Sequence, residues 1–334
     1  MRKQIFIFCA VFFVLGALVG KFVWGAPVAK EREDALDDEL TEVRESGYKY
    51  ISPLLECETG KDTYRLNGLN VLQKEVADVI GKEKESGSIV DAAVYFRDLN
   101  NGPWFGVNEH MAFSPASLLK LPVMMAYYKK AESDSELLSK KVKYTEDYIL
   151  LDQSITPTNF IRKGSEYTIE DLIVRMMVYS DNAALSILEE NIEPARIDEI
   201  TLDLGVETAT EQSPEDFMSV KGYAGLFRIL YNASYIKKDF SERTLEILSQ
   251  SEFRKGLIAG VPKGIPVAHK FGERTLPNNI VQLHDCGIVY RKNNPYLLCI
   301  MTRGSSFENL ENAISKISAV TYDGLEKRAS QLTP

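Results

Sequence analysis

The chain has 334 residues, of which 45% are hydrophobic and 26% are charged, a balance typical of a globular protein with one large domain or two modest ones. Its net charge of −9 argues against nucleic acid as a partner, and no stripe of Lys and Arg with interleaved aromatic residues occurs. The four cysteines lack C-x-x-C spacing and only three histidines are present, so neither a metal site nor a cofactor is expected.

Residues 1–25 carry an export or anchoring pattern. Arg2 and Lys3 precede 17 residues without a charge, from Gln4 to Gly20. A basic start followed by an apolar run is typical of an export signal, but no clean A-x-A site closes this run. We therefore expect an uncleaved membrane anchor rather than a cleaved signal peptide. The basic end should stay in the cytoplasm, which predicts a single-pass protein of a bacterial-type cell membrane with the rest of the chain outside the cytoplasm.

A charged spacer is predicted to follow, over residues 26–63. Its run KEREDALDDELTEVRES, residues 30–46, has few apolar side chains and is typical of a solvated segment. The folded domain is expected to cover residues 64–330.

Helical and strand-like patterns form blocks within that domain. A helical pattern begins near Leu69 and ends at Gly87, and two strand-like runs follow on either side of an NNG turn. A mostly helical middle comes next, then three strand-like runs (IPVAHKFGE, VQLHDCGIVYR and PYLLCIMTR) and a last helix. This order predicts one α+β domain. Its terminal helices would cover one face of an antiparallel sheet, and an all-helical subdomain would pack beside the sheet.

Cys286 and Cys299 flank a predicted turn at KNNP and could face each other across a hairpin. We favour the alternative that both are buried as small hydrophobic side chains.

The stretch SPASLLKLP places Ser117 and Lys120 three residues apart at the start of an apolar helix. Residues three apart on a helix share a face, so the two side chains should be neighbours. Serine becomes a good nucleophile when a base takes its proton, and a buried lysine with a lowered pKa can be that base. The S-x-x-K pattern is weak evidence alone because it also occurs at Ser46 and Ser234, and neither of those copies has an apolar helix after it.

Two further motifs strengthen the assignment of Ser117. Ser180-Asp181-Asn182 lies between two apolar helical runs, and Lys270-Phe271-Gly272 lies on a predicted strand. With S-x-x-K before them, these motifs resemble, in order and context, the S-x-x-K, S-D-N and K-T-G set of class A β-lactamases and penicillin-binding proteins. The resemblance covers the whole predicted domain and implies the fold and the acyl-transfer chemistry of that superfamily.

The resemblance implies catalytic roles for four residues. Ser117 would be the acylated nucleophile and Lys120 its proton acceptor or relay. Ser180 would pass a proton toward the leaving nitrogen. Lys270 would keep the site positive and favour an anionic substrate. This set suits acyl transfer without histidine or metal.

Substrate-binding roles are implied at the neighbouring motif positions. Asn182 would hydrogen-bond the side-chain amide of the substrate, and the N–H groups of Ser117 and Glu273 would form an oxyanion hole. Gly272 completes the K-x-G motif. Phe271 departs from the family, which has Thr or Ser at this position to contact the substrate carboxylate. The lost hydroxyl should weaken recognition of that carboxylate by about 1–3 kcal/mol unless Arg274 or Arg303 replaces it.

A second departure concerns release of the acyl group. Class A β-lactamases have an E-x-x-L-N loop whose glutamate activates the deacylating water, and this chain has no such motif. The interval between Ser180 and Lys270 is also shorter than in those enzymes. The shortening falls near four acidic residues, each expected to lie on the surface: Glu207, Glu211, Glu215 and Asp216. Acylation is therefore expected, followed by slow deacylation.

The leading interpretation is a membrane-anchored serine hydrolase resembling class A β-lactamase, a monomer that acts on a small-molecule β-lactam. A D,D-peptidase or penicillin-binding protein that acts on a peptidoglycan peptide is an alternative, and so is a non-catalytic homologue that binds cell wall.

Overall fold

The computed structural model describes the chain from Glu42 to Leu332, apart from short gaps at residues 58–68, 101, 146–152 and 277–278. Residues 1–41 and 333–334 are also outside the described part. The predicted anchor and the first part of the predicted spacer therefore lie outside the described residues.

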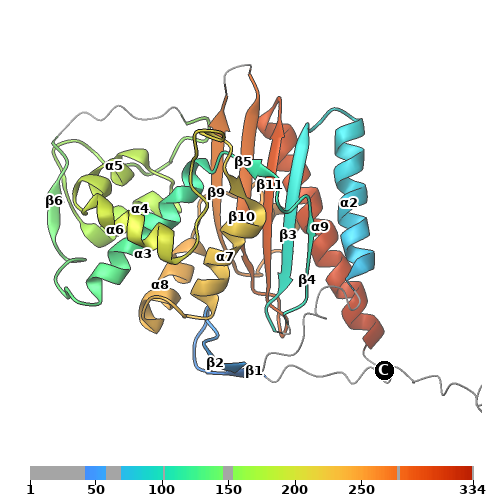
Figure 1. The fold of residues 1–334 in the computed structure, drawn as a ribbon, viewed down its shortest axis with the longest axis horizontal. Coiled ribbons are helices and arrows are strands. Elements are labelled where there is room, and N and C mark those ends of the chain that lie inside the picture. The colour runs from blue at the N-terminus through green and yellow to red at the C-terminus, as the bar shows by residue number, and fades with distance from the viewer. Residues whose placement is uncertain (1–41, 58–68, 101, 146–152, 277–278, 333–334) are drawn as a thin grey trace, which may run out of the picture. The chain divides into compact units, whose positions relative to one another are not determined.

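A five-stranded antiparallel sheet forms the centre of the described fold (Figure 1). Its strands are, in order across the sheet, β4 (Trp104–Val107), β3 (Asp91–Asp98), β11 (Tyr296–Gly304), β10 (Val281–Val289) and β9 (Val267–Thr275). Every residue of β10 is buried, because helices cover both faces of the sheet. β9 is the edge strand beside which the candidate site lies.

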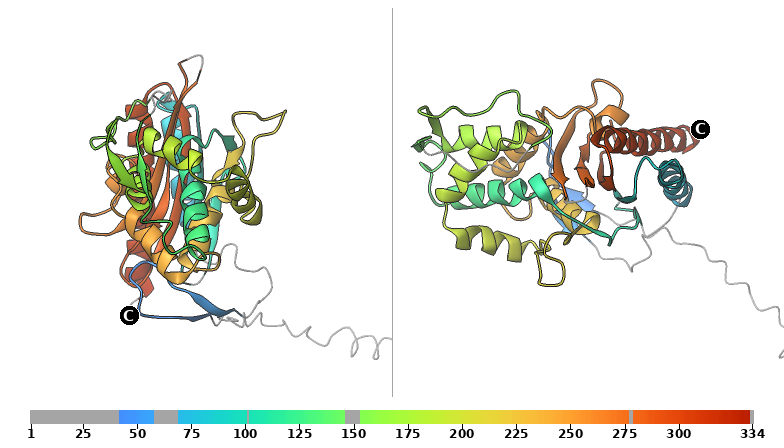
Figure 2. Two further views of the ribbon diagram at one scale, coloured as in Figure 1. Left: turned by 90° about the vertical axis from the view of Figure 1, so that its left-hand side faces the viewer. Right: turned by 90° about the horizontal axis from the view of Figure 1, so that it is seen from above.

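Two long helices cover one face of the sheet (Figures 1 and 2). They are α2 (Asn70–Glu85) and α9 (Phe307–Leu332). Leu72, Val76 and Ile80 of α2 recur at helical spacing and are buried, as the sequence predicts. They join alternate side chains of the strands in one hydrophobic core.

A group of helices lies on the other side of the sheet (Figure 2). These helices are α3 (Lys120–Ala131), α4 (Ile169–Val178), α5 (Asn182–Glu190), α6 (Pro194–Asp203), α7 (Val220–Tyr231) and α8 (Lys238–Leu248). Their buried faces form a second core that includes the opposite side chains of the strands. The predicted α+β class, with terminal helices on an antiparallel sheet and a helical subdomain beside it, is therefore confirmed.

Short elements connect these layers. They are β1 (Glu42–Arg44), β2 (Leu54–Cys57), β5 (Ala112–Phe113), β6 (Lys141–Lys143), β7 (Glu166–Thr168), β8 (Met218–Ser219) and the 3-10 helices η2 (Ala116–Leu119) and η3 (Leu257–Gly260). The strands among them pair as β1 with β2, β5 with β8, and β6 with β7.

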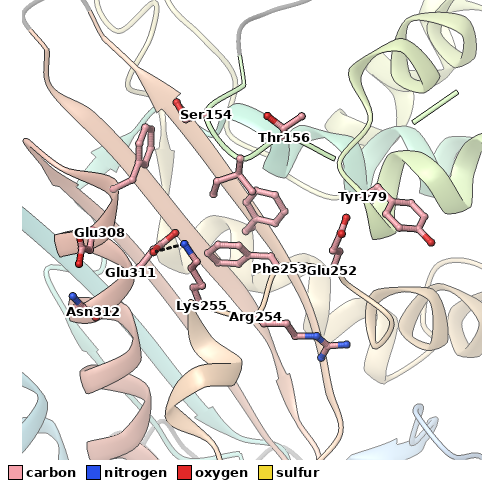
Figure 3. Close-up of a pocket in the computed structure, with 13 residues that line it drawn as sticks. Ser154, Thr156, Tyr179, Glu252, Phe253, Arg254, Lys255, Glu308, Glu311 and Asn312 are labelled. Atoms are coloured by element: carbon pink, nitrogen blue, oxygen red, sulfur yellow. Dashed lines mark ion pairs between the residues drawn. The ribbon is translucent and has the colours of Figure 1, made fainter. Parts of the chain in front are cut away.

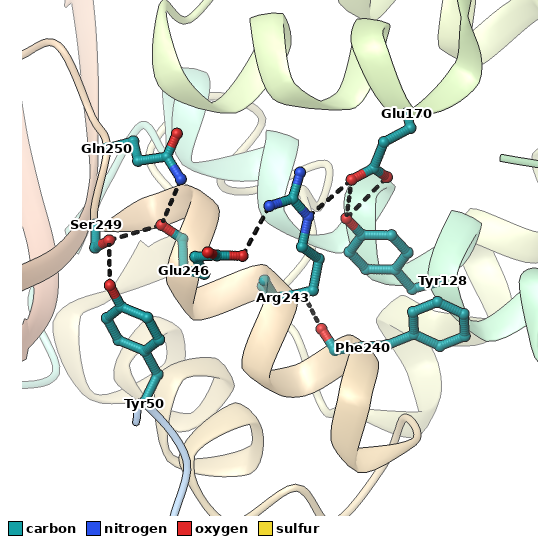
Figure 4. A network of polar contacts seen from close by, with 9 residues as sticks. Tyr50, Tyr128, Glu170, Phe240, Arg243, Glu246, Ser249 and Gln250 are labelled. Carbon is teal, nitrogen blue, oxygen red and sulfur yellow. Dashed lines mark hydrogen bonds and ion pairs between the residues drawn. The ribbon is translucent and has the colours of Figure 1, made fainter. Parts of the chain in front are cut away.

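Part of the predicted spacer is bound to the helical subdomain. The carboxylate of Glu242 accepts hydrogen bonds from the N–H groups of Tyr50 and Ile51, at 2.9 Å each. The Tyr50 hydroxyl lies 3.0 Å from that of Ser249 (Figure 4). The compact unit described here accordingly begins at Glu42, although the domain boundaries drawn from the sequence stay a prediction.

Cys286 and Cys299 form a disulfide bond, and the preference for two unbonded cysteines is wrong. The two residues are direct partners in the register of β10 and β11, with Cα atoms 3.9 Å apart. Both side chains are fully buried. The alternative in which the two cysteines face each other across a hairpin with a turn at KNNP is therefore correct.

The single-pass membrane location predicted from the sequence is corrected by the structure. Between Glu42 and Leu332, apart from the gaps, no helix is both long and apolar enough to span a bilayer.

Candidate active site

Ser117 lies in η2, at the junction with α3. Its backbone neighbour Ala116 has a positive φ of 48°, so the chain turns sharply just before the serine. Ser117 is half-buried, and its hydroxyl makes no hydrogen bond with another described residue. Pro122, three residues into α3, cannot donate to the carbonyl of Leu118. The Tyr223 hydroxyl donates to that carbonyl instead, at 3.0 Å.

Ser180 lies in the turn between α4 and α5. It is fully buried and has a φ of 58°, which is uncommon for a residue with a side chain. The next residue, Asp181, holds this turn in place. Its Oδ1 accepts from the N–H groups of Ala183 and Ala184, and its Oδ2 accepts from the N–H of Ile161 at 2.8 Å. Asp181 is thus the N-cap of α5.

We expect Asp181→Ala to lower the free energy of unfolding by about 2–3 kcal/mol, because three backbone donors lose their acceptor. Urea unfolding followed by circular dichroism would measure the loss. Asp198→Ala, in the exposed part of α6, is the control and should change stability by less than about 0.5 kcal/mol. Equal effects of the two substitutions would contradict the capping role.

Two lysine amines converge on the Ser180 hydroxyl. Lys120 Nζ donates to Ser180 Oγ at 3.0 Å, to the Ser180 carbonyl at 2.6 Å and to Asn182 Oδ1 at 2.7 Å. Lys270 Nζ donates to the same Oγ at 3.2 Å and to the Phe271 carbonyl at 2.7 Å. The structure therefore brings together Lys120, Ser180, Asn182 and Lys270, from three separate parts of the chain.

Burial changes the protonation of both lysines. Lys120 is 1% exposed, and desolvation lowers its pKa from 10.5 to about 7 against the opposing charges of Asp181, Glu273 and Glu189. Burial and the nearby Lys120 charge lower the pKa of Lys270 well below its ordinary value. With a pKa of about 7, the Lys120 amine is neutral in a substantial fraction of molecules near neutral pH and can accept a proton.

Gly272 brings β9 against the turn that carries Ser117. A Cβ atom at Gly272 would lie 2.8 Å from the Pro115 carbonyl oxygen and 3.0 Å from Leu118 Cγ. Only glycine permits this approach without displacing η2. The K-x-G glycine thus has a packing role that fixes the distance between strand and nucleophile turn.

Glu273 and Phe271 have surroundings that the sequence did not predict. Glu273 Oε1 accepts from the N–H of Ile155 at 2.7 Å, so this side chain holds the segment that follows residue 152. Burial raises the pKa of the Glu273 carboxyl group. Phe271 is 3% exposed and stacks on Phe253, with ring centroids 4.5 Å apart.

Three of the four acids in the shortened segment are held by other side chains or the backbone. Glu207 accepts from the Ser219 hydroxyl at 2.9 Å. Glu215 pairs with Arg274 at 3.4 Å, and Asp216 pairs with Arg303. The fourth acid, Glu211, is exposed.

Arg274 and Arg303, the two candidate partners for a substrate carboxylate, are both already bound to other side chains. Arg274 donates to the Ser114 hydroxyl at 3.0 Å in addition to its pairing with Glu215. Arg303 also lies 3.7 Å from Asp91. A substrate carboxylate would have to displace these partners.

Two residues outside the sequence motifs also contribute to the site. Gln153 donates to the Ser180 carbonyl at 3.0 Å, and Glu189 of α5 acts electrostatically on Lys120. Gln153 lies in a segment without periodicity, so no pattern marks it. Glu189 lies seven residues after Asn182, on the same face of α5. Helical spacing in the sequence could therefore have indicated that Glu189 faces the site.

No metal site emerges in the described part of the chain, where no group of three or more His, Cys, Asp and Glu side chains is placed to hold an ion.

Comparison with known proteins identifies the family. A sequence profile of the beta-lactamase enzyme family matches residues 71–325. Curated protein sequences give no significant match.

Solved structures of this family share the fold. The structure of PBP-A has a TM-score of 0.65 at 20% identity, covering 79% of this chain and 98% of PBP-A. A mutant of PBP-A, solved as an acyl-enzyme complex with penicillin G, has a TM-score of 0.65 at 22% identity, covering 78% and 97% of the two chains. A beta-lactamase from Chitinophaga pinensis has a TM-score of 0.67 at 19% identity, covering 77% and 100%. With the profile match over most of its length, the chain belongs to the beta-lactamase enzyme family.

Proposed function

We propose that the protein is a serine hydrolase in which Ser117 attacks the amide carbonyl of a β-lactam and forms an acyl-enzyme. The observation that supports this most strongly is the convergence of the Lys120 and Lys270 amines on the Ser180 hydroxyl, next to the turn that carries Ser117.

In this proposal a neutral Lys120 accepts the proton of Ser117, directly or through Ser180. The serine oxygen bonds to the carbonyl carbon, the carbon–nitrogen bond of the lactam breaks, and Ser180 delivers the proton to the leaving nitrogen. N–H groups of Ser117 and Glu273 stabilise the oxyanion. β9 suits this role because an edge strand has N–H groups that no neighbouring strand uses.

The remaining motif residues would bind the substrate. Asn182, whose Oδ1 already accepts from Lys120, would donate from its amide nitrogen to the acyl side chain. Lys270 would contribute positive charge in the fraction of molecules where it is protonated. Gly272 would keep β9 close to η2, so that the substrate can contact β9 and Ser117 at the same time.

Deacylation is proposed to be slow. The chain lacks the E-x-x-L-N glutamate, and Glu207, Glu215 and Asp216 are each occupied by other partners. None of these three acids is therefore free to activate water at the acyl carbon, so the ester should persist.

Intact-protein mass spectrometry after exposure to benzylpenicillin tests the proposal. We expect an adduct on the wild-type protein that decays over minutes to hours, and no adduct on Ser117→Ala. Loss of penicillin without a detectable adduct would show efficient turnover and contradict slow deacylation. Absence of both adduct and turnover would contradict the proposed reaction with β-lactams.

A D,D-peptidase is the second candidate, favoured by the same lack of a deacylating base. Release of D-alanine from a pentapeptide ending in D-Ala-D-Ala would support it. Muropeptide binding that persists in Ser117→Ala, without chemistry in the wild type, would instead support a non-catalytic cell-wall-binding protein.

A further inference from the structure

A cavity of about 690 Å³ lies along β9, between the first turn of α9 and the end of α4 (Figure 3). It is lined by Ser154, Ile155, Thr156, Tyr179, Glu252, Phe253, Arg254, Lys255, Phe271, Phe307, Glu308, Glu311 and Asn312. This volume is large enough for a ring-sized chemical group.

The cavity adjoins the side of the candidate site where a leaving group would depart. Tyr179, in its wall, directly precedes Ser180, which would protonate the leaving atom. Phe271, also in the wall, has its ring centroid 4.4 Å from the Lys270 Nζ that donates to Ser180 Oγ. The cavity is therefore the candidate location for a group released beside Ser180.

The wall is aromatic. Four rings line it, those of Tyr179, Phe253, Phe271 and Phe307. Phe253 and Phe271 stack, and this stack presents a ring surface in place of the Thr or Ser hydroxyl expected at position 271. Aromatic faces carry negative electrostatic potential and attract cations.

The charges around the rings also disfavour an anion. Three carboxylates line the cavity, at Glu252, Glu308 and Glu311, against the two cations Arg254 and Lys255. Lys255 is paired with Glu311 at 3.3 Å. Arg254 is exposed and points away from the Phe253 ring in Figure 3.

The nearest lysine of the site adds little positive charge. Lys270 is fully buried, and its amine is engaged by the Ser180 hydroxyl and the Phe271 carbonyl. Burial lowers its pKa, so it is a weak partner for a carboxylate.

We infer that the acyl-transfer site prefers substrates whose leaving group is aromatic and neutral or cationic, over substrates whose leaving group carries a carboxylate. This inference rests on the proposed function of Ser117. It names the leaving-group class for that reaction, in which the serine oxygen bonds to the acyl carbon, the bond from that carbon to the leaving atom breaks, that atom takes a proton, and water later hydrolyses the acyl-enzyme to release the acid.

A set of phenylacetate esters separates the possibilities. The leaving phenols would be 3-hydroxybenzoate, 3-methylphenol and 3-hydroxyphenyltrimethylammonium, which differ in charge at one ring position. The kcat/KM of each ester is divided by its hydroxide-catalysed rate, which removes the difference in leaving-group acidity. We expect the cationic ester to exceed the carboxylated ester by about tenfold, with the neutral ester between them.

Two variants connect the preference to the cavity wall. Phe271→Thr should lower the ratio of the corrected kcat/KM for the cationic ester to that for the carboxylated ester at least threefold. The substitution removes an aromatic ring and introduces a hydroxyl group. Glu252→Gln, which removes one negative charge at nearly constant shape, should narrow the same ratio by about twofold to fivefold.

The outcomes distinguish this inference from the proposed function. If benzylpenicillin leaves Ser117 without an acyl adduct, the proposed function fails; if benzylpenicillin acylates Ser117 and none of the esters does, the inference on the leaving group fails. If Ser117 is acylated and the carboxylated ester is preferred, the inference on the leaving group fails, and loss of that preference in Arg254→Ala would identify Arg254 as the carboxylate partner. The inference would also be overturned if the cationic and carboxylated esters had nearly equal corrected kcat/KM values in the wild type and in both variants.

Discussion

Replacing Lys120 by Met should lower the rate of Ser117 acylation by about 10²–10⁴-fold, the usual contribution of a general base. The substitution keeps an unbranched side chain in the buried position and removes the amine that is proposed to accept the proton. Stopped-flow measurement with a fluorescent penicillin would give the rate. Lys130→Met on the same helix is the control, because Lys130 forms an exposed ion pair with Glu193, and its rate should stay within about threefold of wild type.

Lys120→Met should also be more stable than the wild type at low pH. Lys120 has a pKa of about 7 in the folded protein and 10.5 as its ordinary value, so the unfolded chain binds the extra proton between these pH values. The cost of burying the charge is fully present below pH 7 and fades as the pH rises toward 10.5. We expect Lys120→Met to raise the free energy of unfolding by about 1–3 kcal/mol at pH 6 and by clearly less at pH 10.

The pH profile of wild-type acylation follows from the same group. Only the neutral amine accepts a proton, so the acylation rate should rise about tenfold per pH unit below pH 7 and level off above it. The charges of Asp181, Glu273 and Glu189 oppose this lowering of the pKa, and Lys270 is the other amine at the same hydroxyl. A flat profile from pH 5 to pH 9, or acylation by Lys120→Met within tenfold of wild type, would contradict the role of Lys120 as base.

Gly272→Ala is expected to lower acylation by about 10²-fold and the free energy of unfolding by about 1–3 kcal/mol. The added Cβ would lie 2.8 Å from the Pro115 carbonyl oxygen, which is backbone and cannot rotate away. Either η2 or β9 must move, and Ser117 then moves relative to β9. Penicillin labelling and urea unfolding would measure the two effects.

Gly225→Ala is the matched control for this substitution. Gly225 lies in α7, and a Cβ atom there would meet nothing within 4 Å. Alanine in a helix interior should stabilise the protein by about 0.5–1 kcal/mol and leave labelling unchanged. If Gly272→Ala labels as fast as Gly225→Ala, the close contact between β9 and η2 does not position the nucleophile.

Local patterns predicted much of the fold and the motif residues of the site. The apolar spacing of α2 and the strand-like runs of β9, β10 and β11 are properties of short segments, and the structure has these elements. Sequence motifs likewise marked Lys120 and Lys270, whose amines meet at one hydroxyl.

The remaining features depend on contacts between distant segments. The hydrogen bond from Gln153 to the Ser180 carbonyl joins a segment without periodicity to a helix turn, so no local pattern encodes it. The stacking of Phe271 on Phe253 depends on how the chain before η3 returns to β9. The pairing of the cysteines required the register of β10 against β11, which the KNNP turn suggested without determining.

The buried disulfide fixes the alignment of β10 against β11. Cys286 lies opposite Cys299 on β11 and opposite Lys270 on β9, so the bond and the lysine stand at one level of the sheet. A slip of one residue between β10 and β11 would turn the two sulfur atoms to opposite faces, where they could not bond. Oxidation therefore selects one register of β10 against β11, and β10 fixed in this way is the strand against which β9 aligns Lys270.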